Sequence, residues 1–352
     1  MLGFGYAYKG FYKAAATCAG FRLSKPPVVL DMPGAWLAGL VGESARRYYS
    51  DFRVQRDVRR RAGAILREAA GLRLSNCLDF GGIAAGSMFG GEITHGDAAA
   101  PALSPVLNSP KDVTSLAVKM DASSLEETGL IPQLFTWRHQ LRQQERGRML
   151  FAMRIPGVVT LAEQVCGRDL YGWVKSHPDR MFDLAGVLRR ALIRLARLIR
   201  SRTSAPMPVL ILEDPAMGKL DPEVFHGIFW RATRSVVYSL ASFRLFTWYL
   251  APGTSEGHVQ YIGRLRARVA QVGETASLEY IRSNLRGSIL LGHVPAQTLR
   301  DGNPAQVRDI ANACAEKSRA LGLPLFLSPS GAVELGTPLE NIAAFVNVQR
   351  KK

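Results

Sequence analysis

Residues 323–349, near the end of the chain, read LPLFLSPSGAVELGTPLENIAAFVNVQ. The stretch begins with a short apolar run, 323–327, that ends in a turn of small residues. Thr337 is a suitable N-cap, Pro338 suits the first helical position, and Glu340 stands where a capping box places an acid. The stretch therefore predicts a strand, a loop and an amphipathic helix, which is the closing unit of an α/β protein.

Apolar runs of strand length recur along the chain, and helical patterns separate them. The runs are 27–31, 72–79, 149–155, 209–214, 243–250, 267–272, 288–292 and 324–327. Strands that alternate with helices favour a parallel sheet, and eight such units in 352 residues predict a (β/α)₈ TIM barrel. An open doubly wound sheet is the alternative. No GxGxxG follows the first run, which weakens a dinucleotide-binding interpretation.

The domain organisation follows from these runs. We expect an N-terminal extension over residues 1–25, with a helix from about 11 to 20, and a single barrel domain over 26–352. The stretch 81–105 interrupts the alternation and is rich in Gly, Ala, Ser and Pro. We expect it to pass over the mouth of the barrel, with a hairpin near 91–98, and a helix to follow at 110–118.

Composition narrows the class of protein. Hydrophobic residues make up 47% of the chain, enough for a core, and no apolar run reaches the ~18 residues of a membrane span. Lys9 and Lys13 interrupt the first segment, so it is a poor signal peptide. The four cysteines are Cys18, Cys77, Cys166 and Cys314. Their wide spacing argues against a disulfide framework or a structural zinc site, and it predicts a cytoplasmic protein.

The chain carries a formal net charge of +16. Its arginines are spread over predicted helices, in rows at 59–61, 189–200 and 264–268, and such rows are usually solvated faces. No nucleic-acid-binding motif accompanies them. The charge therefore favours an anionic substrate or an acidic partner protein over nucleic acid.

Residues 156–162 read PGVVTLA, and residues 214–225 read DPAMGKLDPEVF. These stretches resemble the GPFTLA turn after the third strand and the D-x-x-x-G-x-L-x-P-E-x-F stretch of the uroporphyrinogen decarboxylase superfamily, which includes cobalamin-dependent methyltransferases. Residues 292–294 (GHV) stand where the family has Gly-Asn-(Val/Leu)-Asp, and 303–307 resemble a helix start. The closing stretch resembles the C-terminal signature. The likeness runs from about residue 26 to 350, and it implies a (β/α)₈ barrel.

The chain also departs from this family at functional positions. Residues 250–253 (LAPG) replace the methyltransferases' His-x-Cys-Gly, and Gly331 stands where they carry a Cys and the decarboxylases a His. Gln164 and Pro215 replace a Tyr and a Ser of the decarboxylases. Asp79 is the residue that matches their essential Asp. Because residues 250–253 and Gly331 lack the zinc ligands of the methyltransferases, we expect no tightly bound zinc. The resemblance implies a corrinoid (cobalamin) as methyl carrier.

In a TIM barrel, functional side chains lie at the carboxyl ends of the strands. A carboxylate or an imidazole there can act as acid or base, and an arginine is expensive to bury without an anion. The expected catalytic residues are Asp79, Asp214 and His293. The expected substrate-binding residues are Arg154, Trp36, Tyr249, Glu274, Ser328 and Ser330.

Each of these residues also has a structural alternative. Asp79 and Asp214 are alternatively turn-forming residues, and His293 a satisfied histidine at the rim of the barrel. Arg154 is alternatively an ion-pair partner of one of the two aspartates. The aromatic residues are as suited to the core as to a pocket wall.

Three functions remain open at this point. The first is a methyltransferase-like enzyme that works with a corrinoid, supplied by a carrier protein, or with an anionic small molecule. The second is a decarboxylase of a polycarboxylated tetrapyrrole, which needs an acid to protonate the ring and cations to hold carboxylates. The third is a non-catalytic barrel that binds a corrinoid, a tetrapyrrole or a partner protein. A homodimer is a further candidate assembly.

Overall fold

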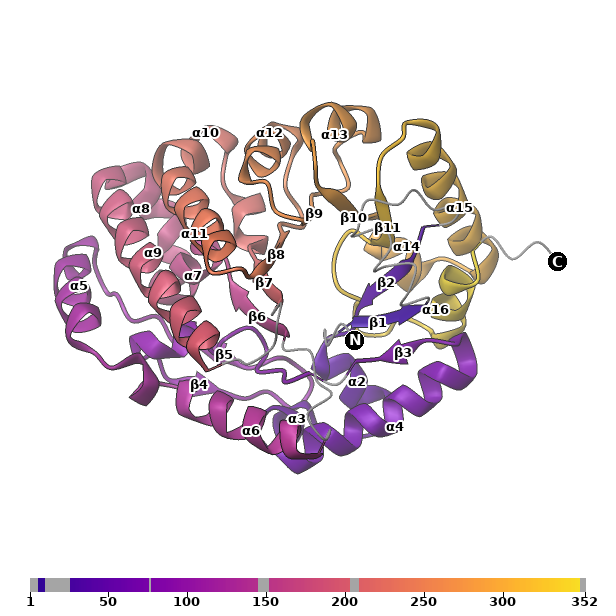
Figure 1. Ribbon diagram of the computed structural model, residues 1–352, viewed down its shortest axis with the longest axis horizontal. Coiled ribbons are helices and arrows are strands. Elements are labelled where there is room, and N and C mark those ends of the chain that lie inside the picture. The colour runs from indigo at the N-terminus through magenta and orange to yellow at the C-terminus, as the bar shows by residue number, and fades with distance from the viewer. Residues whose placement is uncertain (1–5, 10–25, 76, 145–151, 203–208, 349–352) are drawn as a thin grey trace. The chain divides into compact units, whose positions relative to one another are not determined.

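The computed structural model describes residues 6–9, 26–75, 77–144, 152–202 and 209–348 (Figure 1). The chain forms two compact units. Unit 1 holds residues 1–79, 95–100 and 252–352, and unit 2 holds 80–94 and 101–251. The helix predicted at 11–20 lies outside the described residues. Among the described helices, none is long and apolar enough to cross a membrane.

Unit 1 is built on a mixed sheet. Its strands follow the order β3 (Arg73–Leu74), β1 (Tyr6–Lys9), β2 (Val28–Asp31), β11 (Leu325–Pro329), β10 (Ile289–Val294) and β9 (Val269–Gln271). The last four run parallel, whereas β1 pairs antiparallel with both β2 and β3. The helices of unit 1 are α2 (Gly34–Leu40), α3 (Ala45–Ser50), α4 (Phe52–Ala70), α12 (Glu256–Leu265), α13 (Leu278–Asn284), α14 (Ala296–Asp301), α15 (Pro304–Ala320) and α16 (Leu339–Val346).

Unit 2 contains three parallel strands, in the order β8 (Phe246–Leu250), β7 (Val209–Glu213) and β6 (Ala152–Pro156). A small hairpin of β4 (Ile93–Thr94) and β5 (Ala102–Leu103) stands apart from them. The long helix α9 (Pro178–Ser201) packs against α11 (Trp230–Ser242) and α5 (Val113–Ala122). The other helical segments are η1 (Gly86–Phe89), η2 (Pro110–Asp112), η3 (Leu125–Glu127), α6 (Ile131–Gln144), α7 (Val158–Cys166), η4 (Gly167–Asp169), α8 (Leu170–Ser176), η5 (Pro215–Lys219), α10 (Pro222–Val224) and the π-helical η6 (Phe225–Phe229).

Seven of the eight predicted runs are confirmed as parallel strands, because each is a continuous apolar segment that the sheet buries. The prediction for residues 72–79 is wrong. Among the described residues of this range, only Arg73 and Leu74 form a strand, β3, and it runs antiparallel. Side chains of α4 hold the backbone instead: Gln55 bonds both the N–H and the carbonyl of Asp79, and Arg59 donates to the carbonyl of Ser75. These backbone groups are therefore satisfied without a sheet.

The predicted start of the last helix also needs correction. Thr337 does not cap α16, because its hydroxyl donates to the carbonyl of Glu334 at 2.8 Å. The helix begins after Pro338, with no side-chain cap. By contrast, Asn303 caps α15 as expected, in a capping box with Gln306.

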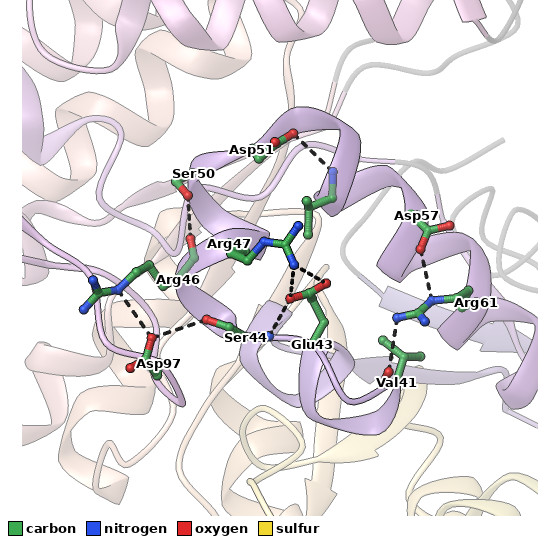
Figure 2. A network of polar contacts seen from close by, with 11 residues as sticks. Val41, Glu43, Ser44, Arg46, Arg47, Ser50, Asp51, Asp57, Arg61 and Asp97 are labelled. Carbon is green, nitrogen blue, oxygen red and sulfur yellow. Dashed lines mark hydrogen bonds and ion pairs between the residues drawn. The ribbon is translucent and has the colours of Figure 1, made fainter.

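A network of surface contacts joins α3 and α4 to the chain around them (Figure 2). Arg47 pairs with Glu43, and Arg61 both pairs with Asp57 and donates to the carbonyl of Val41. Asp97 accepts from Ser44 and pairs with Arg46. The Asp97 contacts explain why residues 95–100 belong to unit 1 although the hairpin strands on either side of them belong to unit 2.

The structure thus shows an α/β fold with parallel strands in each unit. The excursion contains a hairpin as predicted, but its second strand lies at 102–103, beyond the predicted range 91–98. The predicted helix at 110–118 corresponds to η2 and α5.

Candidate functional site

The carboxyl ends of the parallel strands in unit 1 carry buried polar side chains. Ser328 and Ser330 lie two residues apart on and just after β11, so they occupy the same face. Asp31 ends the neighbouring strand β2 and lies three residues beyond Val28, which is in register with Leu327. Asp31, Ser328 and Ser330 are 8%, 0% and 6% exposed. The register therefore places three polar residues beside one another at this end of the sheet.

Two of these side chains have unsatisfied polar atoms. The hydroxyl oxygens of Ser328 and Ser330 are buried and have no hydrogen-bond partner among the described residues. The backbone around them is fixed, because the Ser330 N–H donates to the carbonyl of Val294 and the Gln271 amide donates to that of Pro329. A buried hydroxyl without a partner is unusual in a native protein. Both hydroxyls are therefore available to hydrogen-bond a polar ligand.

His293 lies on the neighbouring strand β10, in register with Ser328. Its Nε2 is 2.8 Å from the carbonyl oxygen of Ala276, while its Nδ1 is buried without a partner among the described residues. Burial lowers the pKa of His293, although the bond to the carbonyl of Ala276, the negative charge of Glu274 and a hydrogen bond to the Glu274 backbone oppose this. Glu274 itself is exposed, in the loop after β9.

Asp79 belongs to a second polar cluster of unit 1. The Tyr48 hydroxyl donates to Asp79 Oδ2 at 3.3 Å, and Arg59 Nη1 donates to the Tyr48 hydroxyl at 2.9 Å. Arg59 and Tyr48 are buried, and burial raises the pKa of Tyr48. A Cβ at Gly34 would lie 2.1 Å from Tyr48 Cε1, so only glycine fits there. Trp36 follows on α2 and is buried at 5% exposure.

In unit 2, Asp214 and Tyr249 form a buried pair on adjacent strands. The Tyr249 hydroxyl donates to Asp214 Oδ2 at 2.7 Å, and the Thr160 N–H donates to Oδ1 at 2.7 Å. Burial raises the pKa of Asp214, and these hydrogen bonds oppose the rise. Burial and the charge of Asp214 raise the pKa of Tyr249 well above its ordinary value. The carboxylate thus holds the first turn of α7, where helix N–H groups favour an anion.

Arg154 pairs with Glu213, which lies on the adjacent strand β7. The two side chains are 20% and 21% exposed. The sequence predicts Asp79 or Asp214 as the ion-pair partner of Arg154. Asp214 is held by Tyr249 and Thr160 instead, because adjacent residues of a strand point to opposite faces and Glu213 takes the side of Arg154.

The structure thus groups the predicted residues into four sets: His293 with Ser328, Ser330 and Glu274; Asp79 near Gly34 and Tyr48; Asp214 with Tyr249; and Arg154 with Glu213. Trp36 makes none of these polar contacts. The first two sets belong to unit 1 and the last two to unit 2.

Tyr48 and Arg59 are not among the site residues that the sequence predicts, and the row 59–61 is predicted to be a solvated face. Arg59 is only 4% exposed. The helical period contained the signal, because Gln55 and Arg59 recur with Ala62 and Leu66 on the buried stripe of α4.

The residues at the family's zinc positions do not fit a zinc ion. Residues 250–253 and Gly331 offer no thiolate or imidazole ligand. In the part of the chain that the structure describes, no group of three or more His, Cys, Asp or Glu side chains is placed to hold a metal ion.

The chain is similar to known proteins in sequence and in fold. The family model "Uroporphyrinogen decarboxylase (URO-D)" matches residues 83–352. A methyltransferase from Methanosarcina mazei superposes with a TM-score of 0.73 over 96% of both chains, at 19% sequence identity, and so shares the fold. A putative vitamin-B12 independent methionine synthase from Listeria monocytogenes matches at a TM-score of 0.40, with 12% identity over 55% of this chain and 61% of that chain. No curated protein matches. The chain belongs to the uroporphyrinogen decarboxylase family.

Proposed function

We propose that the chain is a methyltransferase-like enzyme that binds its small-molecule substrate at the carboxyl ends of β2, β10 and β11. One observation carries this proposal: the hydroxyls of Ser328 and Ser330 and the Nδ1 of His293 are buried without partners among the described residues. Unsatisfied polar atoms at the strand ends of an α/β fold are suited to a polar ligand. Family membership and the shared fold with a methyltransferase are consistent with it.

In this proposal the substrate is an anionic small molecule or a methylated compound, and a corrinoid, which supplies or accepts a methyl group when bound, is the cofactor. A corrinoid carrier protein is then the natural partner. Ser328 and Ser330 bind the substrate, Trp36 and Glu274 line its surroundings, and Asp79 and His293 move protons. We also propose that the parallel strands belong to one closed barrel, as the family resemblance implies.

The predicted roles of the unit 2 residues remain predictions. Asp214 is expected to be catalytic, and Arg154 and Tyr249 are expected to bind substrate. Asp214 accepts hydrogen bonds from Tyr249 and Thr160, and Arg154 pairs with Glu213, so each of the three has a structural function as well.

Decarboxylation of a polycarboxylated tetrapyrrole is the second candidate function. The observation that favours it is the contact between Tyr48 and Asp79, with the buried cation of Arg59 behind the hydroxyl. An Asp held in this way can protonate a pyrrole ring. The family model matched by the chain is also that of the decarboxylases. A barrel that binds such ligands without turnover is the third candidate.

A spectral titration separates these functions. Purified protein is titrated with methylcobalamin and, separately, with an octacarboxylic porphyrin, and its zinc content is measured. Methyltransferase-type function predicts saturable binding of cobalamin and demethylation in the presence of a thiol. Decarboxylase-type function predicts that the porphyrin binds and loses carboxylates. Binding without turnover identifies the non-catalytic alternative. No binding of either compound contradicts both enzymatic functions and a barrel that binds these ligands, and it leaves a barrel that binds a partner protein.

Matched variants connect the titration to the site. Replacing both Ser328 and Ser330 by Ala should lower the affinity for the substrate, measured in the presence of cobalamin, about tenfold. Each lost hydrogen bond is worth roughly 0.5–1.5 kcal/mol. Ser283→Ala changes an exposed serine on α13 and serves as control.

For the porphyrin, Arg154→Lys should lower affinity and leave the melting temperature unchanged, since Lys lacks bidentate geometry. A fall in melting temperature with intact affinity would assign Arg154 to the ion pair alone.

A further inference from the structure

The two ring nitrogens of His293 have different environments. Nε2 lies 2.8 Å from the carbonyl oxygen of Ala276. A carbonyl oxygen can only accept a hydrogen bond, so Nε2 must carry a proton. Nδ1 is buried and has no partner among the described residues. In the neutral ring, Nδ1 therefore presents a lone pair and is an acceptor without a donor.

The groups around the ring determine its charge. Burial lowers the pKa of His293, so the neutral form is favoured near neutral pH. Glu274 is the carboxylate whose charge acts on the ring, and it favours the protonated form. On the side of α15, the sulfur of Cys314 accepts from the His293 backbone, and burial raises the pKa of this thiol, which keeps it uncharged. The ring is thus a neutral base, and Glu274 is the carboxylate whose charge acts on it.

We propose that His293 Nδ1 accepts a hydrogen bond from an O–H, N–H or S–H group of the substrate and takes its proton. The X–H bond breaks, its electron pair stays on X, and an Nδ1–H bond forms. The positive charge of the resulting imidazolium is offset by Glu274. This inference deepens the proposed function, on which it rests, because it identifies the substrate group that reaches β10.

The same geometry restricts how an anionic substrate binds. A carboxylate and Nδ1 are both acceptors, so a carboxylate cannot bond this nitrogen. The hydroxyls of Ser328 and Ser330 are able to donate to one. The expected substrate therefore has a hydrogen-bond donor at one end, directed to His293, and its acceptor groups directed to the serines.

Two substitutions separate the ring nitrogens. His293→Gln places an amide nitrogen near the position of Nε2, so the bond to Ala276 is retained and the base at Nδ1 is lost. His293→Asn places a polar group near the position of Nδ1 and does not reach Ala276. We expect the Gln variant to keep its stability and to lose at least tenfold in turnover, whereas the Asn variant is destabilised. His177→Gln alters an exposed histidine and is the control.

Nitrogen-15 NMR of the full chain tests the protonation state directly. The expected result at pH 7 is a neutral ring of His293 with the proton on Nε2. Titration with 2-mercaptoethanol or ethanolamine, which are donors, should shift the Nδ1 resonance, and acetate should not. A proton on Nδ1, a charged ring at pH 7, a response to acetate alone, or no response to either donor would overturn the inference.

This measurement is independent of methyl transfer. A chain that shows the expected tautomer and donor response but does not bind cobalamin contradicts the proposed methyltransferase function and keeps the assignment of His293. A chain that turns over methylcobalamin but has the proton on Nδ1 supports the methyltransferase function and contradicts the assignment of His293.

Discussion

At the scale of single residues, the pair of Asp214 and Tyr249 shows how a candidate catalytic carboxylate is held. Both residues are completely buried, and the hydroxyl is one donor to the carboxylate. Tyr249→Phe removes this donor and leaves Oδ2 of Asp214 without it. We expect a loss of roughly 1.5–3 kcal/mol in the free energy of unfolding, as for a hydrogen bond to a charged group. Denaturant unfolding measures it, with Tyr238→Phe, an exposed tyrosine on α11, as control.

If the Tyr249 and Tyr238 variants lose the same stability, the buried pair contributes nothing specific. If Tyr249→Phe keeps its stability and loses turnover, Tyr249 acts on the substrate, as the sequence predicted.

The titration of Asp214 gives a prediction with a definite sign. Burial raises its pKa in the folded state, so the folded protein binds the proton more tightly than the unfolded chain. The stability that this group contributes is present below its unfolded pKa of about 3.9 and is lost as pH rises through the folded pKa. Asparagine does not titrate, so the Asp214→Asn variant does not show this loss. The unfolding free energy of the wild type minus that of the variant should therefore decrease as pH rises above about 4. An increase of this difference would show that the folded pKa of Asp214 is lowered.

At the scale of elements, two glycines inside helices test how tightly the helices pack. Gly186 on α9 has open space around an added Cβ, where the nearest atom is 4.0 Å away. Gly263 on α12 does not, since a Cβ there would lie 2.1 Å from the carbonyl oxygen of Asn284. Gly186→Ala should stabilise the protein by about 0.5–1 kcal/mol, because alanine favours the helix. Gly263→Ala should destabilise it by about 1–3 kcal/mol, because backbone must move.

Thermal and denaturant unfolding of the two variants provides the comparison. Each glycine is the control for the other, as both changes add the same methyl group within a helix. Destabilisation by Gly186→Ala, or a neutral effect of Gly263→Ala, would contradict the packing of these helices.

The sequence predicted the elements that depend on continuous apolar runs. The strand β7 and the helix α9 are examples, since burial of each follows from its own residues. It did not predict the irregular path around Asp79, because that path depends on Gln55 and Arg59, which lie more than fifteen residues earlier. The sequence predicts Thr337 as a helix cap, whereas its hydroxyl donates to the carbonyl of Glu334.

The candidate site was predicted in its residues but not in its pairings. The positions of Ser328 and His293 at strand ends follow from the strand pattern alone. The pairing of Arg154 with Glu213 depends on the register between β6 and β7. The tautomer of His293 depends on the loop that carries Ala276, because the Ala276 carbonyl contacts Nε2. Neither register nor loop path is encoded in a local pattern of the sequence.

At the scale of the whole molecule, the positive charge is the property that most needs a test. Lysine and arginine exceed aspartate and glutamate by 45 − 29 = 16 residues. Part of this charge serves the fold: Arg194 on α9 donates to the carbonyls of Met120 and Ser123, and Arg190 pairs with Asp121. Arginines that are held by neighbouring helices are not arranged to follow a nucleic-acid backbone.

We therefore expect only non-specific, salt-sensitive binding to nucleic acid. Fluorescence anisotropy with a labelled DNA duplex should show weak binding at about 50 mM salt that falls by orders of magnitude at about 200 mM, since counterion release supplies its free energy. Two duplexes of unrelated sequence should bind equally. An anionic substrate responds differently, because a buried contact is screened much less by salt than a surface charge. Sequence-dependent binding that persists at the higher salt would make nucleic acid the partner and remove the charge as an argument for a small anionic ligand.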